Sequence, residues 1–328
     1  MKTISIVTPC FNEEANVIEL CGRVRQVMVA CGYAYEHIFI DNASRDGTFG
    51  ILKHLAESDR RIKLIRNTRN FGHLRSPMHG MFQARGDAVV LLFADLQDPP
   101  ELLADMVREW EKGTPIVIAI KASSEESRSM FWIRRKYYST VRRLANIDLH
   151  ENFTGFGLYD AKVMNMLRQF RDPYPYFRGM IAEIGMTHAE IPYNQQVRRR
   201  GKTKNNFYTL YDLAMLGITT LSKVPLRVLT LGGFVGSALS AFVGFVYLIF
   251  KLAFWNKYSM GIATLVIGQF FLGSAQLMFM GILGEYIGNV QTIVQNRPLV
   301  LEEERINFEY LPGESEDEVP HQSGRATD

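Results

Sequence analysis

The sequence is poor in cysteine, and the few cysteines it has form no recognisable pattern. Only Cys10, Cys21 and Cys31 occur in 328 residues, and neither their odd number nor their spacing suits a disulfide framework or a zinc site. We therefore expect free thiols in a reducing compartment. We also expect no secretory leader, because Lys2 is followed by a short apolar run that ends at Pro9.

Two phosphate-binding signatures are missing as well. No glycine-rich loop follows the first expected strand and no Walker lysine motif occurs, which excludes a P-loop enzyme and the usual dinucleotide fold. Strand-like apolar runs alternate instead with stretches of helical spacing. We expect strands at 3–8, 37–40, 62–65, 116–120 and from Ala88 onward, with helices from Glu13, over 49–58 and over 76–84. This order predicts an α/β fold with a doubly wound sheet and right-handed crossovers.

Positive charge is scarce only towards the C-terminus. Residues 302–328 carry nine acidic side chains and two arginines, whereas residues 1–301 have a net charge of +10. We expect the tail beyond Glu302 to be disordered, and the basic body predicts an anionic partner. Between Lys121 and Arg143, seven basic residues are interleaved with aromatic ones. A solvated helix, a nucleic-acid surface or a lipid head-group site would each produce that mixture.

Two long stretches contain no charged residue. Residues 228–250 and 258–284 are 23 and 27 residues long, and each exceeds the roughly 20 residues that cross a bilayer. We expect two transmembrane helices in a hairpin, with an amphipathic juxtamembrane helix over 206–227 before them and an acidic tail, 285–328, after them. Basic flanks at Lys223, Arg227 and Arg297 favour a cytosolic position for both termini. The chain is thus predicted to be integral to the cytoplasmic membrane, which argues against nucleic acid as a partner.

The apolar run from Ala88 ends in a polar cluster. Asp95, Gln97 and Asp98 follow within a few residues, and Pro99-Pro100-Glu101 then opens a helix. We interpret Asp98 as the N-cap of that helix. Asp95 and Gln97 are not needed for capping, and polar side chains at the carboxyl end of a central strand lie where open α/β sheets bind ligands.

Taken in order, several segments resemble a known family. They are Val7–Glu14, Asp41–Thr48, Arg69–Gly72, Gly86-Asp87, Ala94–Glu101, Phe177–Gly179 and Arg200–Lys204. The series is similar to that of the inverting nucleotide-sugar glycosyltransferases of family 2. More narrowly, it resembles the polyprenyl-phosphate glycosyltransferases related to dolichyl-phosphate mannose synthase and bacterial bactoprenol glucosyltransferases. This resemblance implies a cytosolic, Rossmann-like GT-A catalytic domain over residues 1–205, ahead of the transmembrane hairpin.

The resemblance also implies a nucleotide site. Pro9, Glu13 and Asp41 fall where the base and ribose of a nucleotide sugar, such as a UDP-hexose, would be held. Carboxylates suit this role because they accept hydrogen bonds from hydroxyl and N–H groups. Asp46 lies in the same turn, and it either joins the nucleotide site or caps the following helix.

A metal and a diphosphate are implied beside the nucleotide. By resemblance, Asp95 and Gln97 would contact Mg²⁺ or Mn²⁺, which prefer hard oxygen ligands. Asp95 is therefore also a candidate catalytic residue, since the metal would neutralise charge on the departing nucleoside diphosphate. Arg200 and Lys204, on a basic loop, would close over that diphosphate.

The acceptor implied by the resemblance is polyprenyl (undecaprenyl) phosphate. Arg128 and Arg134 would receive this lipid phosphate, and Arg178 would either support the acceptor side or form a structural ion pair. The phosphate oxygen would attack the anomeric carbon from the face opposite the nucleotide and invert its configuration. Because a phosphate is ionised at neutral pH, a general base is less necessary than for a hydroxyl acceptor.

The sequence departs from the family pattern in two places. Phe93 stands where the first aspartate of an Asp-x-Asp metal motif is usual, which predicts looser metal binding. Residues 154–158 lack the aspartate that many relatives carry there, and Asp160 and Glu151 are the nearest substitutes. The first departure leaves open a non-catalytic scaffold that retains nucleotide-sugar binding. The second argues against a base-catalysed mechanism.

The resulting prediction is transfer of a hexose, with glucose as the first candidate, from a nucleotide sugar to polyprenyl phosphate. Glycines in the apolar stretches, among them Gly232, Gly236 and Gly268, offer small-residue faces that would pack the hairpin on itself or build a homo-oligomer.

Overall fold

The computed structural model describes residues 2–122, 152–170, 172–195, 224–253 and 262–308. These residues belong to two units of the chain. The first unit contains residues 1–128, 149–204 and 296–328, and the second contains 129–148 and 205–295. The C-terminal part of the chain therefore belongs to the same unit as the N-terminal part.

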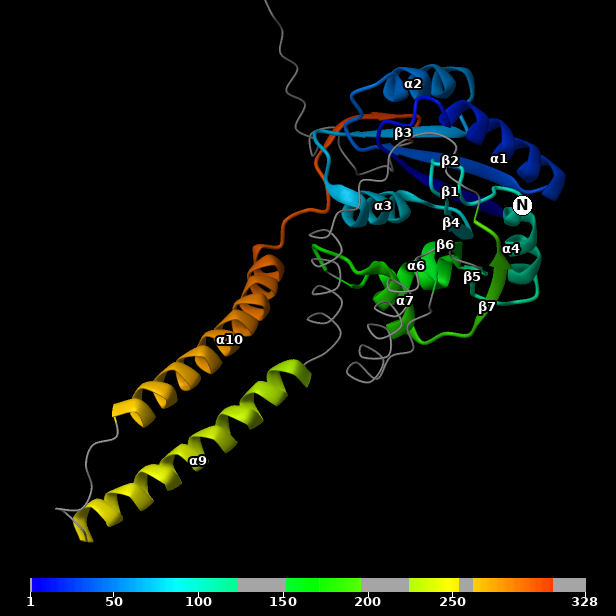
Figure 1. Cartoon of the computed structure of the whole chain (residues 1–328). Helices are drawn as coiled ribbons and strands as arrows, with labels where there is room; N and C mark the ends of the chain where they lie inside the picture. The colour runs from blue at the N-terminus through cyan, green and yellow to red at the C-terminus, as the bar shows by residue number, and fades with distance from the viewer. Residues whose placement is uncertain (1, 123–151, 171, 196–223, 254–261, 309–328) are drawn as a thin grey trace, which may run out of the picture. The chain divides into compact units, whose positions relative to one another are not determined.

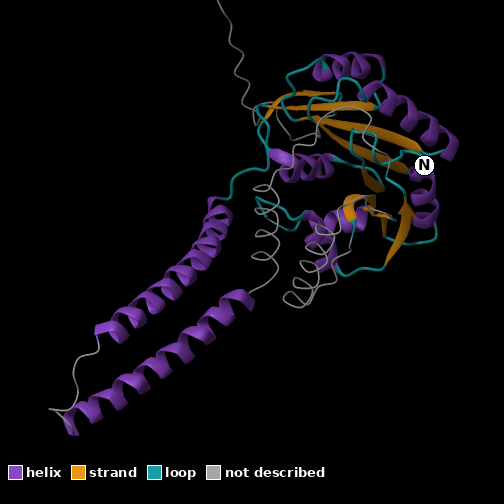
Figure 2. Ribbon diagram, in the orientation of Figure 1, coloured by secondary structure: helices purple, strands orange, loops and turns teal. Residues whose placement is uncertain are grey.

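A mixed sheet forms the centre of the first unit, and its described strands lie in the order β7-β5-β6-β4-β1-β2-β3-β8 (Figures 1 and 2). They are β1 (Thr3–Cys10), β2 (Ala34–Asp41), β3 (Ile62–Asn67), β4 (Ala88–Leu91), β5 (Ile116–Lys121), β6 (Phe153–Asp160), β7 (His188–Tyr193) and β8 (Glu302–Ile306). Parallel pairing joins β1 to β4, and it also joins β2 to both β1 and β3. β6 and β8 run antiparallel to their neighbours. The predicted Rossmann-like α/β class is confirmed, with three strands that the sequence analysis did not assign.

Helices cover both faces of this sheet (Figure 2). One apolar cluster contains residues of α1 (Val17–Cys31), α2 (Thr48–Ser58) and α4 (Leu102–Glu111), and the other contains residues of α3 (Gly72–Gln83), α6 (Ala161–Leu167) and α7 (Phe177–Ile184). Successive side chains of a strand point to opposite faces of the sheet, so Ile6 packs in the first cluster and Val7 in the second. α3 approaches the sheet closely at Gly80, where a Cβ atom would lie 2.1 Å from Ile40 Cδ1.

Several predicted element boundaries are wrong. α1 begins at Val17 rather than at Glu13, and α3 spans Gly72–Gln83 rather than 76–84. β1 continues through Pro9 to Cys10. Proline has no N–H to donate to a neighbouring strand, but β4 pairs with β1 only as far as Val7, so no hydrogen bond is lost at Pro9. α4 begins at Leu102, and Asp98 is not its N-cap. The Asp98 carboxylate instead accepts a hydrogen bond from the Tyr193 hydroxyl, and the carbonyls of residues 99 and 100 start the helical turn.

The expectation of disorder beyond Glu302 is wrong for residues 302–308. β8 adds to the free edge of β3, where Glu303 pairs with Arg66 and Glu304 with Lys53. Glu302 is hydrogen-bonded to His79. The amide of Asn307 also donates to two backbone carbonyls. Charge pairing and main-chain bonds thus order a segment whose composition alone indicates disorder. The rest of the tail, 309–328, lies outside the described residues.

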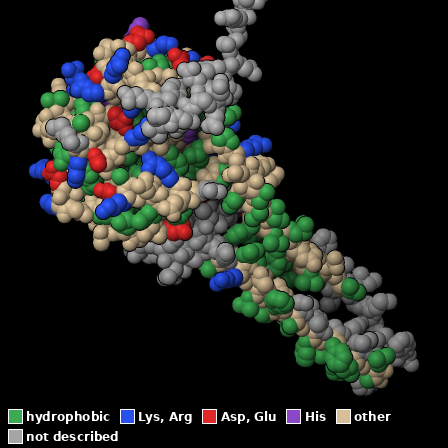
Figure 3. All heavy atoms as spheres, turned by 180° about the vertical axis from the view of Figure 1, so that it is seen from behind, with side chains coloured by type: hydrophobic (Ala, Val, Ile, Leu, Met, Phe, Trp, Pro, Cys, Tyr) green, Lys and Arg blue, Asp and Glu red, His purple; other side chains and the backbone are tan. Residues whose placement is uncertain are grey.

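The second unit is described as two helices, α9 (Val224–Ala253) and α10 (Ile262–Gln295). Hydrophobic side chains are gathered over their surface (Figure 3), and Phe234 and Phe271 are both 71% exposed. α10 runs past Gly284, the predicted end of the second span. Within the described residues, Phe271–Gln295 is long and apolar enough to cross a membrane, and Leu226–Gly236 is a shorter apolar stretch.

The glycines of these helices have open surroundings. At Gly232, Gly236 and Gly268, no described atom would contact an added Cβ within 4 Å. Packing of the hairpin on itself at these glycines therefore has no support in the described part of the chain. Self-association stays a prediction.

Candidate functional site

The candidate site lies at the carboxyl ends of three adjacent parallel strands. β4, β1 and β2 are neighbours in the sheet, so the loops after Leu91, Cys10 and Asp41 leave the same edge. The chain passes from β1 to β2 on one side and returns to β4 on the other. This reversal is the switch point at which open α/β sheets bind ligands. The structure thus brings the predicted Pro9, Glu13, Asp41 and Asp95 to one edge of the sheet.

Asp41 ends β2 and is fully buried. Both of its carboxylate oxygens lie 3.2 Å from the Ser44 backbone N–H, which donates to them, and the Arg66 Nε atom is 4.0 Å from Oδ2. Burial raises the pKa of Asp41, and these hydrogen bonds only partly oppose that effect. Asp41 therefore organises the turn that follows it, and its predicted contact with a nucleotide stays a prediction.

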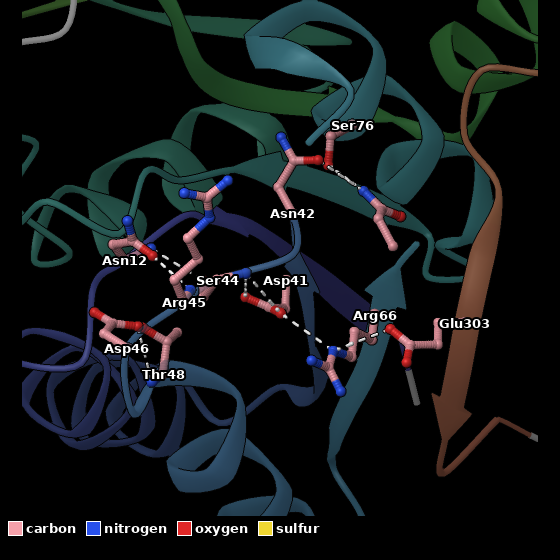
Figure 4. A network of polar contacts seen from close by, with 11 residues as sticks. Asn12, Asp41, Asn42, Ser44, Arg45, Asp46, Thr48, Arg66, Ser76 and Glu303 are labelled. Atoms are coloured by element: carbon pink, nitrogen blue, oxygen red, sulfur yellow. Dashed lines mark hydrogen bonds and ion pairs between the residues drawn. The ribbon is translucent and has the colours of Figure 1, made fainter. Parts of the chain in front are cut away.

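The turn after β2 interlocks with the loop after β1 (Figure 4). Asn12 donates its N–H to Ser44 Oγ at 2.9 Å and accepts the Arg45 N–H at 2.8 Å. The Glu13 N–H donates to Thr48 Oγ1 at 2.8 Å. Reciprocal bonds of this kind fix the two loops relative to each other, so that the ends of β1 and β2 form one rigid surface.

Asp46 and Glu13, two acidic residues at this junction, have protein partners. Asp46 Oδ1 accepts both the N–H and the hydroxyl of Thr48, and Oδ2 accepts the Glu14 N–H. These bonds favour the structural interpretation of Asp46, at the start of α2, over nucleotide binding. The Glu13 carboxylate accepts the Asn16 amide at 2.6 Å.

Asn42, next to Asp41, is the centre of a buried amide network. Its Oδ1 accepts from Asn67 Nδ2 and the Phe71 N–H, while its Nδ2 donates to Asn70 Oδ1 and the Gly72 carbonyl. All four hydrogen-bonding positions of the amide are thus used. The network explains the Arg69–Gly72 motif, to which the sequence analysis assigned no role: the motif is a loop clamped to the end of β2.

The C-terminal strand reaches the same edge. Glu303 on β8 lies 3.3 Å from Arg66 Nε, so that Arg66 stands between Glu303 and Asp41 (Figure 4). The Arg66 guanidinium also stacks over Phe49, 4.3 Å from the ring centroid. No local pattern in the sequence indicates this pairing, because Arg66 and Glu303 are brought together only by the addition of β8 to β3.

The loop after β4 presents the predicted metal ligands. Asp95 is half-buried, and its Oδ1 accepts the Gln97 N–H at 3.2 Å. Leu96 between them has a φ of 56°, a left-handed conformation that is strained for a residue with a bulky side chain. Phe93, in place of the usual aspartate, packs against the apolar cluster beneath. The donor set is then one carboxylate and one amide.

This donor set fits a hard divalent cation that takes its remaining ligands from a diphosphate and water. Within the described ranges, no group of three or more histidine, cysteine or acidic side chains could hold a metal without such help. The donor set is therefore compatible with a divalent cation delivered with a nucleotide diphosphate.

Asp98 follows Gln97 in the same loop and is bound to the Tyr193 hydroxyl. It is 2% exposed, and burial raises its pKa to about 6, with the hydrogen bond from the Tyr193 hydroxyl acting in the opposite direction. Tyr193 is the last residue of β7 and is 6% exposed. The residues are 95 positions apart, so sequence reasoning could not find the pair.

Arg178 lies in the first turn of α7 and donates to the Phe153 carbonyl at 3.1 Å. Asp160 is wrong as a substitute base. It pairs with Ala88 at the start of β4, the opposite end of that strand from Asp95, and it accepts the Trp110 indole N–H. Glu151 lies outside the described residues, as do the predicted Arg128, Arg134, Arg200 and Lys204.

Comparison with known proteins identifies a family for this chain. Residues 5–167 match the model of glycosyl transferase family 2. An uncharacterised glycosyltransferase of Synechocystis is 34% identical over 94% of this chain and 97% of its own length. The uncharacterised glycosyltransferase YkcC of Bacillus subtilis is 31% identical over 93% of this chain and 94% of its own length.

A third relative carries a more specific name. The SfII prophage-derived bactoprenol glucosyl transferase of Shigella flexneri is 32% identical over 90% of this chain and 96% of its own length. The chain belongs to glycosyl transferase family 2, and it is a glycosyltransferase with the Rossmann-like GT-A fold.

Proposed function

We propose that the protein transfers a hexose from a nucleotide sugar to a polyprenyl phosphate at the cytosolic face of a membrane. The observation that carries this proposal is the similarity to a bactoprenol glucosyl transferase over 90% of the chain. The rigid edge formed by the ends of β1, β2 and β4 supports it, because that edge offers carboxylates at the switch point of the sheet.

On the donor side, the interlocked loops around Asp41 and Glu13 would hold the base and ribose, with Pro9 at the end of β1. Asp95 and Gln97 would hold Mg²⁺ or Mn²⁺. When bound, such an ion neutralises negative charge on the leaving diphosphate. Arg200 and Lys204 would add positive charge around the same group, as the resemblance implies.

On the acceptor side, Arg128, Arg134 and Arg178 would bind the lipid phosphate. One phosphate oxygen would form the new bond to the anomeric carbon while the bond from that carbon to the nucleoside diphosphate breaks, with inversion. The acceptor phosphate is already ionised at neutral pH, so no protein base is required. Asp160 lies at the far end of β4 from Asp95 and would not serve as such a base.

A lipid acceptor suits the second unit of the chain. Its helices α9 and α10 carry exposed apolar side chains along their length, which favours burial in a bilayer. The basic residues around these helices favour a cytosolic active site. The product would be a lipid-linked sugar for glycosylation of the cell envelope.

The test is a donor screen on the full-length protein in detergent or nanodiscs. Labelled UDP-glucose and other nucleotide sugars are supplied with undecaprenyl phosphate and Mn²⁺ or Mg²⁺, and lipid products are separated by thin-layer chromatography. We expect one labelled lipid, and its loss by about 100-fold or more in Asp95→Asn. No labelled lipid with any donor would refute the proposal, and nucleotide-sugar binding without transfer would favour the non-catalytic scaffold.

A further inference from the structure

We propose that the buried Tyr193–Asp98 pair is a positioning device that holds the strained turn at Leu96, and thereby sets Asp95 and Gln97 for a metal-bound nucleoside diphosphate. This inference rests on the proposed function, and it assigns a role to two residues that the reaction itself does not use.

The need for such a device comes from the turn itself. Leu96 has a φ of 56°, a conformation in which a leucine Cβ crowds its own backbone and which persists only where the surroundings enforce it. The left-handed conformation of Leu96 directs the side chains of Asp95 and Gln97 differently from the way an extended backbone would direct them. A loop free to relax would lose that arrangement.

Contacts on both sides of Leu96 enforce the turn. Upstream, Asp95 Oδ1 accepts the Gln97 N–H at 3.2 Å and closes the turn over the strained residue. The Leu96 side chain is itself 8% exposed and belongs to the apolar cluster under the sheet. Downstream, Asp98 is bound to the Tyr193 hydroxyl, so the chain is held at a fixed point two residues after the strain.

Tyr193 is a rigid anchor for this purpose. It is paired with Lys121 in the β5–β7 ladder, and its carbonyl accepts the Ala122 N–H at 2.9 Å. Its ring packs edge-to-face on Phe156 of β6, with 5.9 Å between ring centroids. Two strands therefore fix the hydroxyl that holds Asp98.

Packing alone does not explain the polar pair. A phenylalanine would fill the same space as Tyr193 and would bury no hydroxyl, whereas a buried carboxylate is costly unless it is hydrogen-bonded. The N-terminus of α4 makes no use of Asp98 either, since that helix begins at Leu102. The pair is thus available to hold the loop that carries Asp95.

The first experiment compares Tyr193→Phe with wild type. The concentration of Mn²⁺ for half-maximal sugar transfer should rise about tenfold, as expected for loss of one hydrogen bond to a carboxylate, with a smaller change in kcat. Mn²⁺ binding in the presence of UDP, followed by electron paramagnetic resonance, should weaken by a similar factor. Tyr33→Phe is the matched control, because its hydroxyl also binds a carboxylate, that of Glu111, away from the loop.

Two further sets of variants separate positioning from simple loss of stability. Asp98→Asn retains a carbonyl that accepts the hydroxyl hydrogen, so Mn²⁺ binding should stay within about threefold of wild type, whereas Asp98→Ala should behave like Tyr193→Phe. In a Leu96→Gly background the turn is no longer strained, and Tyr193→Phe should then leave the affinity for Mn²⁺ unchanged.

Unchanged Mn²⁺ binding in a folded Tyr193→Phe protein would overturn the inference. Asp98→Ala, measured in the same way, decides the question where Tyr193→Phe does not fold. The binding measurement needs no transfer activity. A wild-type protein that binds Mn²⁺ with UDP but transfers no sugar would therefore contradict the proposed function without contradicting the positioning role.

Discussion

Glu302 offers a quantitative test of how firmly the C-terminal strand is joined to the sheet. Its side chain is 12% exposed and accepts hydrogen bonds from His79 and from two nitrogens of Arg305. Burial by itself would raise the pKa of Glu302, but the hydrogen bonds from His79 and Arg305 outweigh burial and lower the pKa from 4.5 to about 2. At 1.36 kcal/mol for each pH unit, this corresponds to about 3 kcal/mol of stability.

The sign of the effect follows from the direction of the shift. Because the folded protein holds the ionised carboxylate, the stabilisation is complete above pH 4.5 and is lost as the pH falls towards 2. Glu302→Gln removes the charge at every pH. We expect it to cost about 2–3 kcal/mol of local stability, and the acid sensitivity of β8 should disappear with it.

Hydrogen–deuterium exchange of the full-length protein, read from peptides of β3 and β8, measures this loss. A cost of about 2–3 kcal/mol should speed amide exchange there by about 30- to 150-fold. Glu304→Gln is the matched control, since Glu304 is on the same strand but forms a half-exposed pair with Lys53, worth less than about 1 kcal/mol. Equal exchange rates in the two variants would refute the reasoning.

Three further predictions concern the sheet and the site. Gly80→Ala should cost about 1–3 kcal/mol of unfolding free energy in a urea titration, because an added methyl group would collide with the sheet, whereas Gly22→Ala on an open helix face should cost nothing. Phe93→Asp should tighten Mn²⁺ binding in a metal titration with UDP, and no tightening would contradict the idea of an incomplete metal motif. Burial raises the pKa of Asp41, so its carboxylate is protonated more readily as the pH is lowered, and the KM for the nucleotide sugar should then rise. Asp41→Asn should remove that pH dependence. A KM that does not change with pH in wild type would exclude a role for the ionised carboxylate.

The amino-acid sequence by itself determined the parts of this protein that depend on local pattern. Alternating and helical spacing of apolar residues placed β1 to β5 and their helices, because the period of that pattern is set by the geometry of each element. Chain order then put Asp41 and Asp95 at strand ends, where an α/β sheet binds ligands. The family resemblance also rested on short segments that can be seen without a structure.

Only the tertiary structure decided which side chains meet. Asp98 was assigned to a helix cap on local grounds, yet its partner is Tyr193. Asp160 was a candidate base until the antiparallel β6 placed it at the wrong end of β4. The acidic strand β8 was expected to be disordered, although it closes the sheet and brings Glu303 to Arg66. The physical reason is the same in each case: partners distant in sequence are selected by strand order and register, which no local pattern encodes.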